Sequence, residues 1–430
     1  MDKLHFIDLR YKSECWSLLE ELFPIYRTIL GEGFQKSLNI IRKIIPISIL
    51  EYPSGSKCGS WTIPDEWILR DAYIKNSKGE IILSHQDNQF YVWQYSIPFS
   101  GIISREELNQ HIFVEENNSN SIPHRVAYYS NNWGFSLSHS QFNYLNDENY
   151  FVEIDTELRK GAITIAELYL QGNKEDEIII DAVLSCPSLA NNLSGVVVAV
   201  FLADMIAGIK NRNFSYRILF TPETIGPIAL HYLQNKFGKK VVGGYNLINL
   251  AFGKGFHYKK SRAGNTIADK AMEHSLKHFG REYELRDYDV LTGTCGNEKA
   301  YNSLGLKIPI GSLHRSPLGS YPEYDTDQDN LGFIDEDTMY ESLKVCWGAI
   351  QTLERAKLYK HKFEGEPFLT GYGLYPKIKK DIDRIPYDYL MGFTDGDMSL
   401  IDIAEKAGIS ITDFDQAVYQ MLDKGLIEAL

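Results

Sequence analysis

Residues 183–195 constrain the fold of this chain more than any other stretch, and they read V-L-S-C-P-S-L-A-N-N-L-S-G. Three isoleucines at 178–180 form a short apolar run before it, typical of a buried strand, and apolar residues with helical spacing follow it from 196 to 209. In α/β proteins a strand, a polar turn and a buried helix place side chains at the carboxyl edge of a sheet, where ligands usually bind. Because the turn holds a thiol, amides and hydroxyls, the sequence predicts a functional site here.

Length and charge limit the classes of function. A chain of 430 residues has room for two or three domains, and its formal net charge of -13 argues against nucleic acid and anionic membranes as partners. The five cysteines include no C-x-x-C pair, which favours a reducing compartment. The N-terminus lacks the apolar core of a signal peptide, and the most apolar window, 196–209, is shorter than the roughly 20 residues that span a bilayer. We therefore expect a cytoplasmic protein.

Three kinds of sequence pattern divide the chain. Residues 1–48 read as two helices, and residues 125–372 alternate between strand-like and helical runs, so together they predict one discontinuous α/β sandwich domain with a largely buried sheet. Residues 49–124 contain short β-type runs and turn residues, including the aromatic run 90–95, and predict a β-rich insertion. Within the α/β domain, strands are expected at 162–170, 178–180 and 216–220, and helices at 195–211, 224–236 and 265–278.

Residues 373–430 have the pattern of a winged-helix domain. Ser399 begins a helix that Gly408 ends, and a second helix over 412–424 precedes a short strand. The second helix carries three aspartates and one lysine, so its face would repel DNA phosphates. We expect this domain to pack against protein, either another copy of the chain or a partner subunit, and not to bind nucleic acid.

A set of ordered motifs gives the chain a family resemblance. They are E-L-F-P-I-Y-R-T (21–28), W-T-I-P-D-E-W (61–67), R-D-A-Y-I-K (70–75), W-G-F-S-L-S-H (133–139), C-P-S-L-A-N-N-L-S-G (186–195), T-P-E-T-I-G (221–226), Y-K-K-S-R (258–262), G-S-L-H-R-S-P (311–317) and Y-P-E-Y-D-T (321–326). With them the chain resembles bacterial polysaccharide-biosynthesis proteins with an aminopeptidase-like domain. The resemblance implies a three-layer sandwich with a mixed sheet like that of di-zinc aminopeptidases, a β-rich insertion and a C-terminal winged helix.

The resemblance also implies positions for metal ligands, and most of them are substituted. The family's first turn reads approximately C-H-P-S-L-A-N-D-N-L-S-G; here Cys186 stands at the histidine, and the turn is one residue shorter, so that Asn192 marks the place of the missing aspartate. Asn297 replaces the aspartate of a second element, approximately S-D-E-R-Q-Y, and Asp325 replaces the histidine of Y-P-E-Y-H-T. Glu223 is the one acidic group of the set that is unchanged.

These substitutions leave two hypotheses. A zinc pair needs a bridging carboxylate and negative charge, and amide oxygens are poor zinc ligands. The chain is then a metal-free pseudoenzyme that binds a small peptide- or amino-acid-like ligand or a partner subunit. Alternatively, Cys186, Glu223 and Asp325 hold one zinc in an active hydrolase. Structural roles are the competing interpretation: a buried thiol for Cys186, and for Glu223 an acid that complements a helix dipole.

Other polar residues are candidates for ligand contacts. Tyr258, Ser261 and Arg262 could bind an anionic group, because the arginine fork suits carboxylate or phosphate. His314 could supply an imidazole to the site, and His139 could line the same cleft. Structural roles are the alternative for all five, and the commoner one for the histidines. The sequence contains no G-x-S-x-G, so a serine hydrolase has no support.

Overall fold

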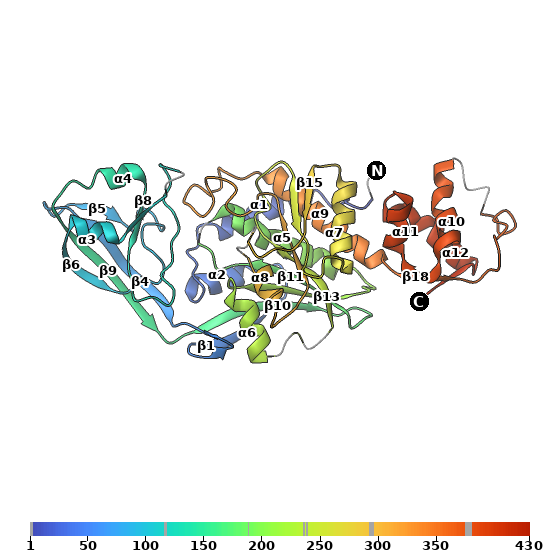
Figure 1. The fold of residues 1–430 in the computed structure, drawn as a ribbon, viewed down its shortest axis with the longest axis horizontal. Helices are drawn as coiled ribbons and strands as arrows, with labels where there is room; N and C mark the ends of the chain where they lie inside the picture. Colours follow the sequence, from blue (N-terminus) through green and yellow to red (C-terminus); the bar gives the residue numbers. More distant parts are fainter. Residues whose placement is uncertain are drawn as a thin grey trace.

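The computed structural model is an elongated molecule in three parts (Figure 1). A β-rich domain lies at one end, an α/β domain in the middle, and a small helical domain with the C-terminus at the other end. The structure describes residues 3–115, 118–187, 189–234, 237, 240–291, 296–374 and 381–430. The expected helix 224–236 therefore ends outside the described residues, and the expected start of the last domain includes 375–380, which also lie outside them.

An eight-stranded mixed sheet forms the middle domain, in the order β1-β10-β12-β11-β13-β16-β14-β15. The strands are β1 (Ser48–Pro53), β10 (Ala162–Leu170), β11 (Glu177–Val183), β12 (Ser215–Thr221), β13 (Val241–Leu247), β14 (Phe256–Lys259), β15 (Tyr283–Arg286) and β16 (Ile310–His314). The central strands β12, β11, β13 and β16 are parallel, whereas β10 and β14 run antiparallel to their inner neighbours. The three expected strands are all present.

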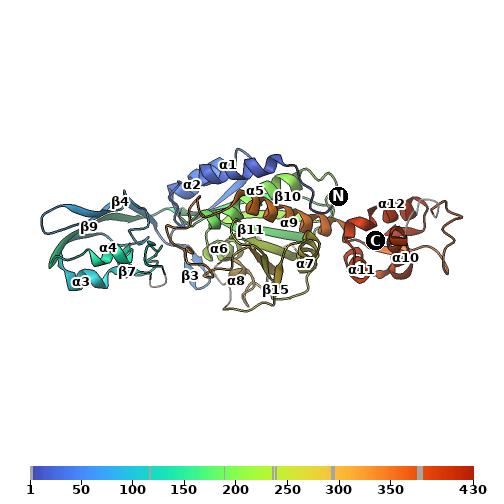
Figure 2. The same ribbon diagram turned by 90° about the horizontal axis from the view of Figure 1, so that it is seen from above.

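Helices cover both faces of this sheet and complete three layers (Figure 2). One layer holds α1 (Arg10–Leu22), α2 (Glu32–Ile41), α5 (Ala190–Ala207), α7 (Ile267–Phe279) and α9 (Glu336–Arg355); the other holds α6 (Ile225–Gln234) and α8 (Glu298–Tyr301). Alternation along β11 explains how one strand serves both layers, because Ile178 and Ile180 pack with the first set of helices and Ile179 with the second. The three-layer sandwich expected from the resemblance is confirmed.

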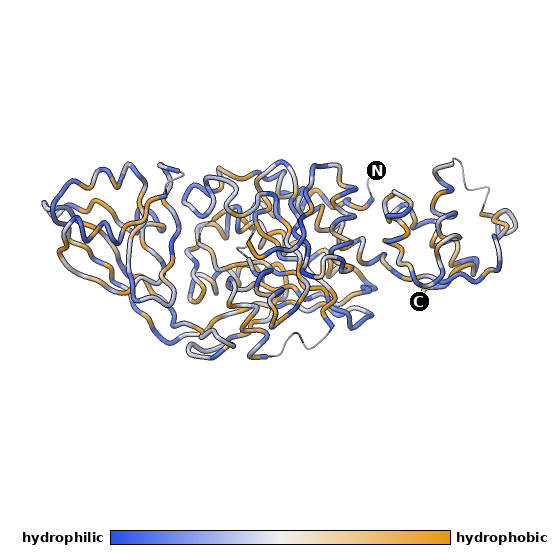
Figure 3. The backbone as a smooth tube through the Cα atoms, in the orientation of Figure 1, coloured by the Kyte–Doolittle hydropathy of each residue, from blue (hydrophilic) through white to orange (hydrophobic). Residues whose placement is uncertain are grey.

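Helix α5 is the core helix of the domain. It follows β11 directly, and nearly all of its side chains are buried, so it has no need of a polar face. Of the described helices it alone has the length and apolar composition to cross a membrane, yet here it packs against α1, α9 and β11. Figure 3 shows hydrophobic segments in all three parts of the molecule, the middle part included.

The β-rich domain extends further than the sequence suggested. Its sheet, β5-β4-β9-β6, consists of β4 (Glu66–Lys75), β5 (Ile81–Ser84), β6 (Phe99–Ser104) and β9 (Asn149–Arg159), and it carries α3 (Arg105–Gln110), β7 (Ile112–Val114), β8 (Phe135–Leu137) and α4 (His139–Asn143). Both expected boundaries, 49 and 124, are wrong, because the β-rich domain begins after β1 and continues through β9. Strand β1 pairs with β10 in the large sheet, and β9 pairs with both β4 and β6.

The aromatic run 90–95 is not a strand. Its only pairings in the described chain are two isolated bridges, at Val92 and Gln94, and Tyr95 has a φ of 65° that turns the chain. Four of its side chains, Phe90, Tyr91, Val92 and Tyr95, are buried because they fill the core of the β-rich domain. The strand expected here is wrong. Aromatic and β-branched residues favour buried positions as well as strands, so their presence does not by itself fix the backbone conformation.

The C-terminal domain combines a helical group with a three-stranded sheet. Its elements are β17 (Leu358–His361), α10 (Asp381–Phe393), β18 (Asp395–Ser399), α11 (Leu400–Ala407), the 3-10 helix η2 (Ile411–Phe414), α12 (Asp415–Asp423) and β19 (Ile427–Ala429). Ser399 caps α11 by accepting the Asp402 N–H, and Gly408 ends it with a φ of 70°. Because β17 pairs with β18 and β19, the domain begins near residue 357, before the expected start at 373.

Candidate functional site

A cavity of about 430 Å³ opens where β11 and β12 end. The turn after β11 lines it, together with the residues that follow β12, a segment at 124–129 and a loop at 324–329. Four of the five family ligand positions lie along it: Cys186, Asn192, Glu223 and Asp325. The sheet edge singled out from the sequence is therefore the edge of a cavity, as the strand–turn–helix arrangement requires.

Glu223 is partly buried and lines the cavity. Its backbone N–H donates to Ser185 Oγ (3.0 Å), and the next residue, Thr224, has a φ of 61°. The Glu223 carboxylate accepts no hydrogen bond from any residue in the described part of the chain. Burial, together with repulsion from Asp325 and Glu298, raises the pKa of Glu223 from 4.5 to about 7. The carboxyl can therefore hold or release a proton near neutral pH.

His124 is a cavity residue that the sequence analysis missed. Its Nδ1 lies 3.2 Å from Asp325 Oδ1, and its backbone N–H donates to the Asp325 carbonyl (2.8 Å). The His124 Nε2 is buried and has no partner among the described residues. The imidazole that His314 was expected to supply thus comes from a residue 201 positions before Asp325. No local signal marks it, since only the folded chain brings the two segments together.

Two amide oxygens of the cavity lining have no hydrogen-bond donor among the described residues. Asn192 is 8% exposed and Asn249 1%, both line the cavity, and the Oδ1 of each has no donor within the described ranges. Asp329 also lines the cavity; it accepts the Asn191 N–H (2.8 Å), and burial raises its pKa from 3.8 to about 7. Orphaned buried oxygens carry a desolvation cost that a ligand with N–H groups would remove.

Asn297 lies beneath the cavity and not in it. Its Nδ2 donates to Asp181 Oδ2 (2.7 Å) and Thr221 Oγ1 (2.6 Å), while its Oδ1 accepts the Thr224 N–H (2.7 Å). Burial raises the pKa of Asp181 to about 6, although hydrogen bonds from Asn297, Thr221 and Tyr301 oppose the shift. The Asn297 amide donates to a carboxylate and accepts a backbone N–H at once, so Asn297 is a structural link where the family pattern has a ligand.

A zinc site does not fit these residues. Asn297 is committed to its link, and the missing aspartate leaves no bridging carboxylate. Among the described residues, one group of three His, Cys, Asp or Glu side chains brings its ligand atoms within 4.8 Å of one another, and it is not at the cavity. Cys186, Glu223 and Asp325 form no such group. We derive no zinc-dependent step from this geometry.

The group that does meet that distance, His274, His278 and Glu405, joins the α/β domain to the C-terminal domain. His274 Nδ1 contacts Glu405 Oε1, and its Nε2 accepts the Ile411 N–H (3.0 Å). Lys277 pairs with the other Glu405 oxygen (2.6 Å). Because the Ile411 N–H needs the lone pair of Nε2, the ring proton stands on Nδ1 and faces Glu405. The group is thus a domain contact with both ring nitrogens of His274 in use.

The other sequence candidates lie away from the cavity. Tyr258 Oη, Ser261 Oγ and the Ser261 N–H all donate to Asp269, at 2.9, 2.6 and 2.8 Å, so these groups hold a buried carboxylate and not a ligand anion. Arg262 is exposed and outside the cavity lining. His314 is buried against Ser312 Oγ (2.9 Å), and burial lowers its pKa to about 3.

His139 begins α4 in the β-rich domain, so it does not line the cleft either. The loop that carries Asp325 is, however, joined to that domain. Asp327 Oδ1 accepts the Ile122 N–H (2.8 Å), its Oδ2 accepts Asn88 Nδ2 (3.0 Å), and a bridge pairs Pro123 with Thr326. One wall of the cavity is therefore built jointly by the β-rich and α/β domains.

Comparison with known proteins extends these findings. The family model described as "Domain of unknown function (DUF4910)" matches residues 16–356, and a "winged helix-turn-helix" model matches residues 357–429. A curated protein from Clostridium acetobutylicum, named "Putative polysaccharide biosynthesis protein with aminopeptidase-like domain", is 37% identical over an alignment of 406 residues, and the match covers 92% of each chain. The expected winged helix is confirmed.

Solved structures give the same picture. The crystal structure of a "putative peptidase" from Clostridium acetobutylicum matches with a TM-score of 0.90 and 34% identity, over 98% of this chain and 97% of that one. BSAP, a zinc aminopeptidase from Bacillus subtilis, matches with a TM-score of 0.57 and 12% identity, over 79% of this chain and 94% of that one, a likeness of fold alone. This chain therefore belongs to the DUF4910 family and consists of an aminopeptidase-like domain followed by a winged helix.

Proposed function

We propose that the cavity binds the amino end of a small amino-acid- or peptide-like ligand without a zinc-dependent reaction. The observation that carries this proposal is the set of acceptor oxygens that line the cavity. Asn192 Oδ1 and Asn249 Oδ1 have no donor among the described residues, and the carboxylates of Glu223 and Asp325, which repel each other, line the same cavity. A primary ammonium brings three N–H donors and one positive charge, which is what such a set of oxygens lacks.

The rest of the cavity suits the side chain of such a ligand. Apolar walls come from Ile29, Leu189, Ile225 and Ile248. Tyr128 lines the cavity next to Glu223, and burial raises the pKa of its hydroxyl well above 10, so it stays protonated and can donate. An ammonium at one end and an apolar body at the other therefore match the polar floor and apolar walls.

The proposal places this protein among aminopeptidase-like proteins that retain a cleft and lack its hydrolytic chemistry. The name of the Clostridium acetobutylicum relative supports a biosynthetic setting, and the acidic charge and cysteine pattern support a cytoplasmic one. The winged helix, whose α12 carries Asp415 and Asp423, would serve protein contacts, either with a second copy or with a partner subunit.

Ligand binding tests the proposal directly. Amides of glycine, leucine and phenylalanine would be titrated into the full chain in EDTA, by calorimetry and thermal shift. At least one amide should bind and raise the melting temperature, whereas its N-acetylated form, which has no ammonium, should not. Glu223→Gln should weaken amide binding about tenfold or more, since a charge-assisted hydrogen bond is lost. The exposed Glu284→Gln is the matched control and should leave binding unchanged. No binding by any amide would refute the proposal.

The second hypothesis, one zinc on Cys186, Glu223 and Asp325 in an active hydrolase, predicts a different result. Protein purified without chelators would then contain about one zinc per chain, and Cys186→Ala would lose it. His278→Ala is a necessary control variant, because His274, His278 and Glu405 form a second place where adventitious zinc could bind. Zinc that disappears only in Cys186→Ala would replace the amine-binding proposal with the hydrolase.

A further inference from the structure

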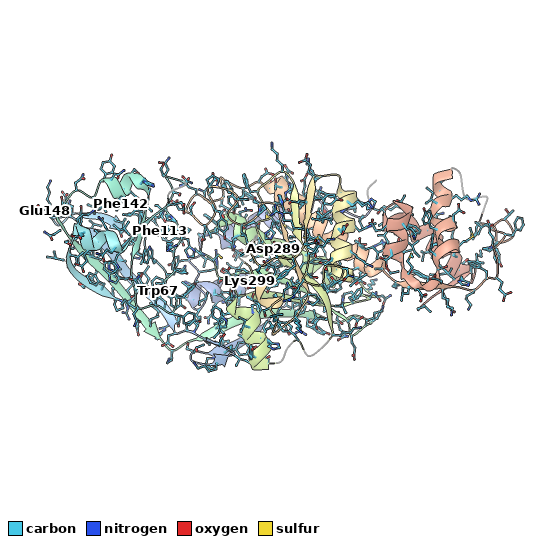
Figure 4. All side chains as sticks on the ribbon, viewed as in Figure 1. Trp67, Phe113, Phe142, Glu148, Asp289 and Lys299 are labelled. Carbon is cyan, nitrogen blue, oxygen red and sulfur yellow. The ribbon has the colours of Figure 1, made fainter. Side chains whose placement is uncertain are left out.

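Arg125 stands at the rim of the same cavity and has not been accounted for. Its guanidinium stacks over the ring of Phe113 at 4.0 Å and lies 6.0 Å from the Trp93 ring. Phe113, on β7, is labelled in Figure 4, in the β-rich domain. Arg125 forms no salt bridge with any acidic residue that the structure describes. Among the described residues of the cavity lining, Arg125 is the one arginine, and no described residue accepts a hydrogen bond from its guanidinium.

The contact with Phe113 restricts the conformations of the Arg125 side chain. A guanidinium held flat against an aromatic ring loses little freedom when it binds, and its donors remain directed along the ring plane. The backbone fixes it as well, because the Gln94 N–H donates to the Arg125 carbonyl (2.9 Å). A planar pair of N–H donors is the group that recognises a carboxylate through two parallel hydrogen bonds.

Acidic and basic side chains line the same cavity. His124 contacts Asp325, on the acidic side, while its neighbour Arg125 stacks at the rim. The floor therefore attracts a cation and the rim attracts an anion. A ligand that carries only an ammonium would use the floor and leave the rim unfilled, whereas a zwitterion would use both.

We propose that the cavity selects small zwitterions, free amino acids or dipeptides, whose ammonium meets the acceptors around Glu223 and whose carboxylate binds Arg125. This inference rests on the proposed amine-binding function and narrows it. A long peptide has no carboxylate near its amino end, so it would gain nothing from Arg125. The preferred ligand is thus a monomer or a very short peptide with a free carboxyl group.

One other position competes for the carboxylate. A second cavity of about 360 Å³ shares Trp61 and Thr224 with the first, and Lys299 is the one charged residue along its described lining. Lys299 is labelled in Figure 4, in the α/β domain. A longer zwitterion would lay its carboxylate there. If the carboxylate binds Arg125, Arg125→Gln should weaken its binding and Lys299→Gln should not. If it binds Lys299, the reverse should hold.

The test compares matched ligands on the full chain by calorimetry: L-leucine, L-leucinamide and N-acetyl-L-leucine, with glycine and phenylalanine sets in parallel. The wild type should bind the free amino acid about tenfold or more tightly than its amide, as a carboxylate–guanidinium pair provides. Arg125→Gln should bring that ratio close to one and leave amide affinity unchanged. Lys299→Gln and the exposed Arg262→Gln are matched controls and should keep the ratio.

Each other outcome has a definite meaning. Equal affinity for acid and amide in the wild type overturns the zwitterion inference and leaves amine binding intact. A ratio that Lys299→Gln abolishes and Arg125→Gln preserves overturns the assignment to Arg125. Tighter binding of the N-acetylated acid than of the amide would overturn the proposed function itself. Circular dichroism of Arg125→Gln guards against misfolding, since unchanged amide affinity requires an intact cavity.

Discussion

Two carboxylates of this molecule, Asp269 and Glu223, have opposite surroundings. Asp269 accepts hydrogen bonds from Tyr258, from both donors of Ser261 and from both donors of Thr266, at 2.6 to 3.0 Å. Glu223 accepts none from the described residues, although it too lies in the same domain. Glu223 lies within the motif 221–226, whereas Asp269 lies outside all the family motifs, so the sequence alone did not single out Asp269.

The difference separates a structural carboxylate from a functional one. A fully satisfied anion gains hydrogen bonds at the moment of folding and has nothing left to offer a ligand. An unsatisfied anion costs stability in the free protein and recovers that cost when a cation arrives. Asp269 therefore holds β14 to α7, whereas the Glu223 carboxylate lines the cavity and remains able to bind a ligand.

The largest expected effect is that of Asp269→Ala. The substitution leaves five donors without an acceptor, so the free energy of unfolding should fall by roughly 3–5 kcal/mol. Denaturation by urea at pH 7.5 measures it. A loss below about 1 kcal/mol, within the range of ordinary surface changes, would break the contrast between the two carboxylates.

Asn297→Asp should have a smaller effect that depends on pH. The new carboxylate faces Asp181 at a position where the amide now donates at 2.7 Å, and like charges at that distance cannot both ionise cheaply. The pair would titrate above the pKa of about 6 that Asp181 already has. The variant should therefore lose about 2 kcal/mol at pH 8 and much less at pH 5. Equal losses at both pH values would contradict the network proposed beneath the cavity.

Glu223→Gln should have the smallest effect on stability and the opposite sign. The folded-state pKa of Glu223 is raised from 4.5 to about 7, so its contribution is fully present below pH 4.5 and is lost as pH rises through 7. Glutamine carries no charge to desolvate, so the variant should be more stable than the wild type by about 1 kcal/mol at pH 8, and this gain should shrink as the pH falls and vanish below pH 4.5. Thermal unfolding across this pH range decides it; a variant less stable at pH 8 would mean that Glu223 has structural partners.

Much of the fold follows from local patterns. The buried strand and helix at β11 and α5, and the caps of α11 at Ser399 and Gly408, could be predicted because apolar runs and capping are properties of neighbouring residues. The position of the cavity at the end of β11 followed from the same local logic. The nature of the ligand chemistry there did not.

What the sequence missed arises from distant pairing. His124 meets Asp325 across 201 residues, and β9 joins β4 and β6 with no sign in its own sequence that it belongs to the β-rich domain. Tyr258 and Ser261 were expected at a ligand, yet their hydroxyls reach Asp269. A polar motif indicates that its side chains form hydrogen bonds. Only the folded chain shows whether the acceptor is a ligand or another residue of the protein.

The contacts of Asp327 with Ile122 and Asn88 have a consequence for how the molecule melts. They join the loop of the α/β domain that carries Asp327 to two segments of the β-rich domain, at Asn88 and Ile122. This wall of the cavity therefore exists only while both domains are folded. Two folding units that share a binding site need not unfold together when it is empty, but a bound ligand makes each depend on the other. Saturating ligand should therefore merge separate heat-capacity transitions of the β-rich and α/β domains into one.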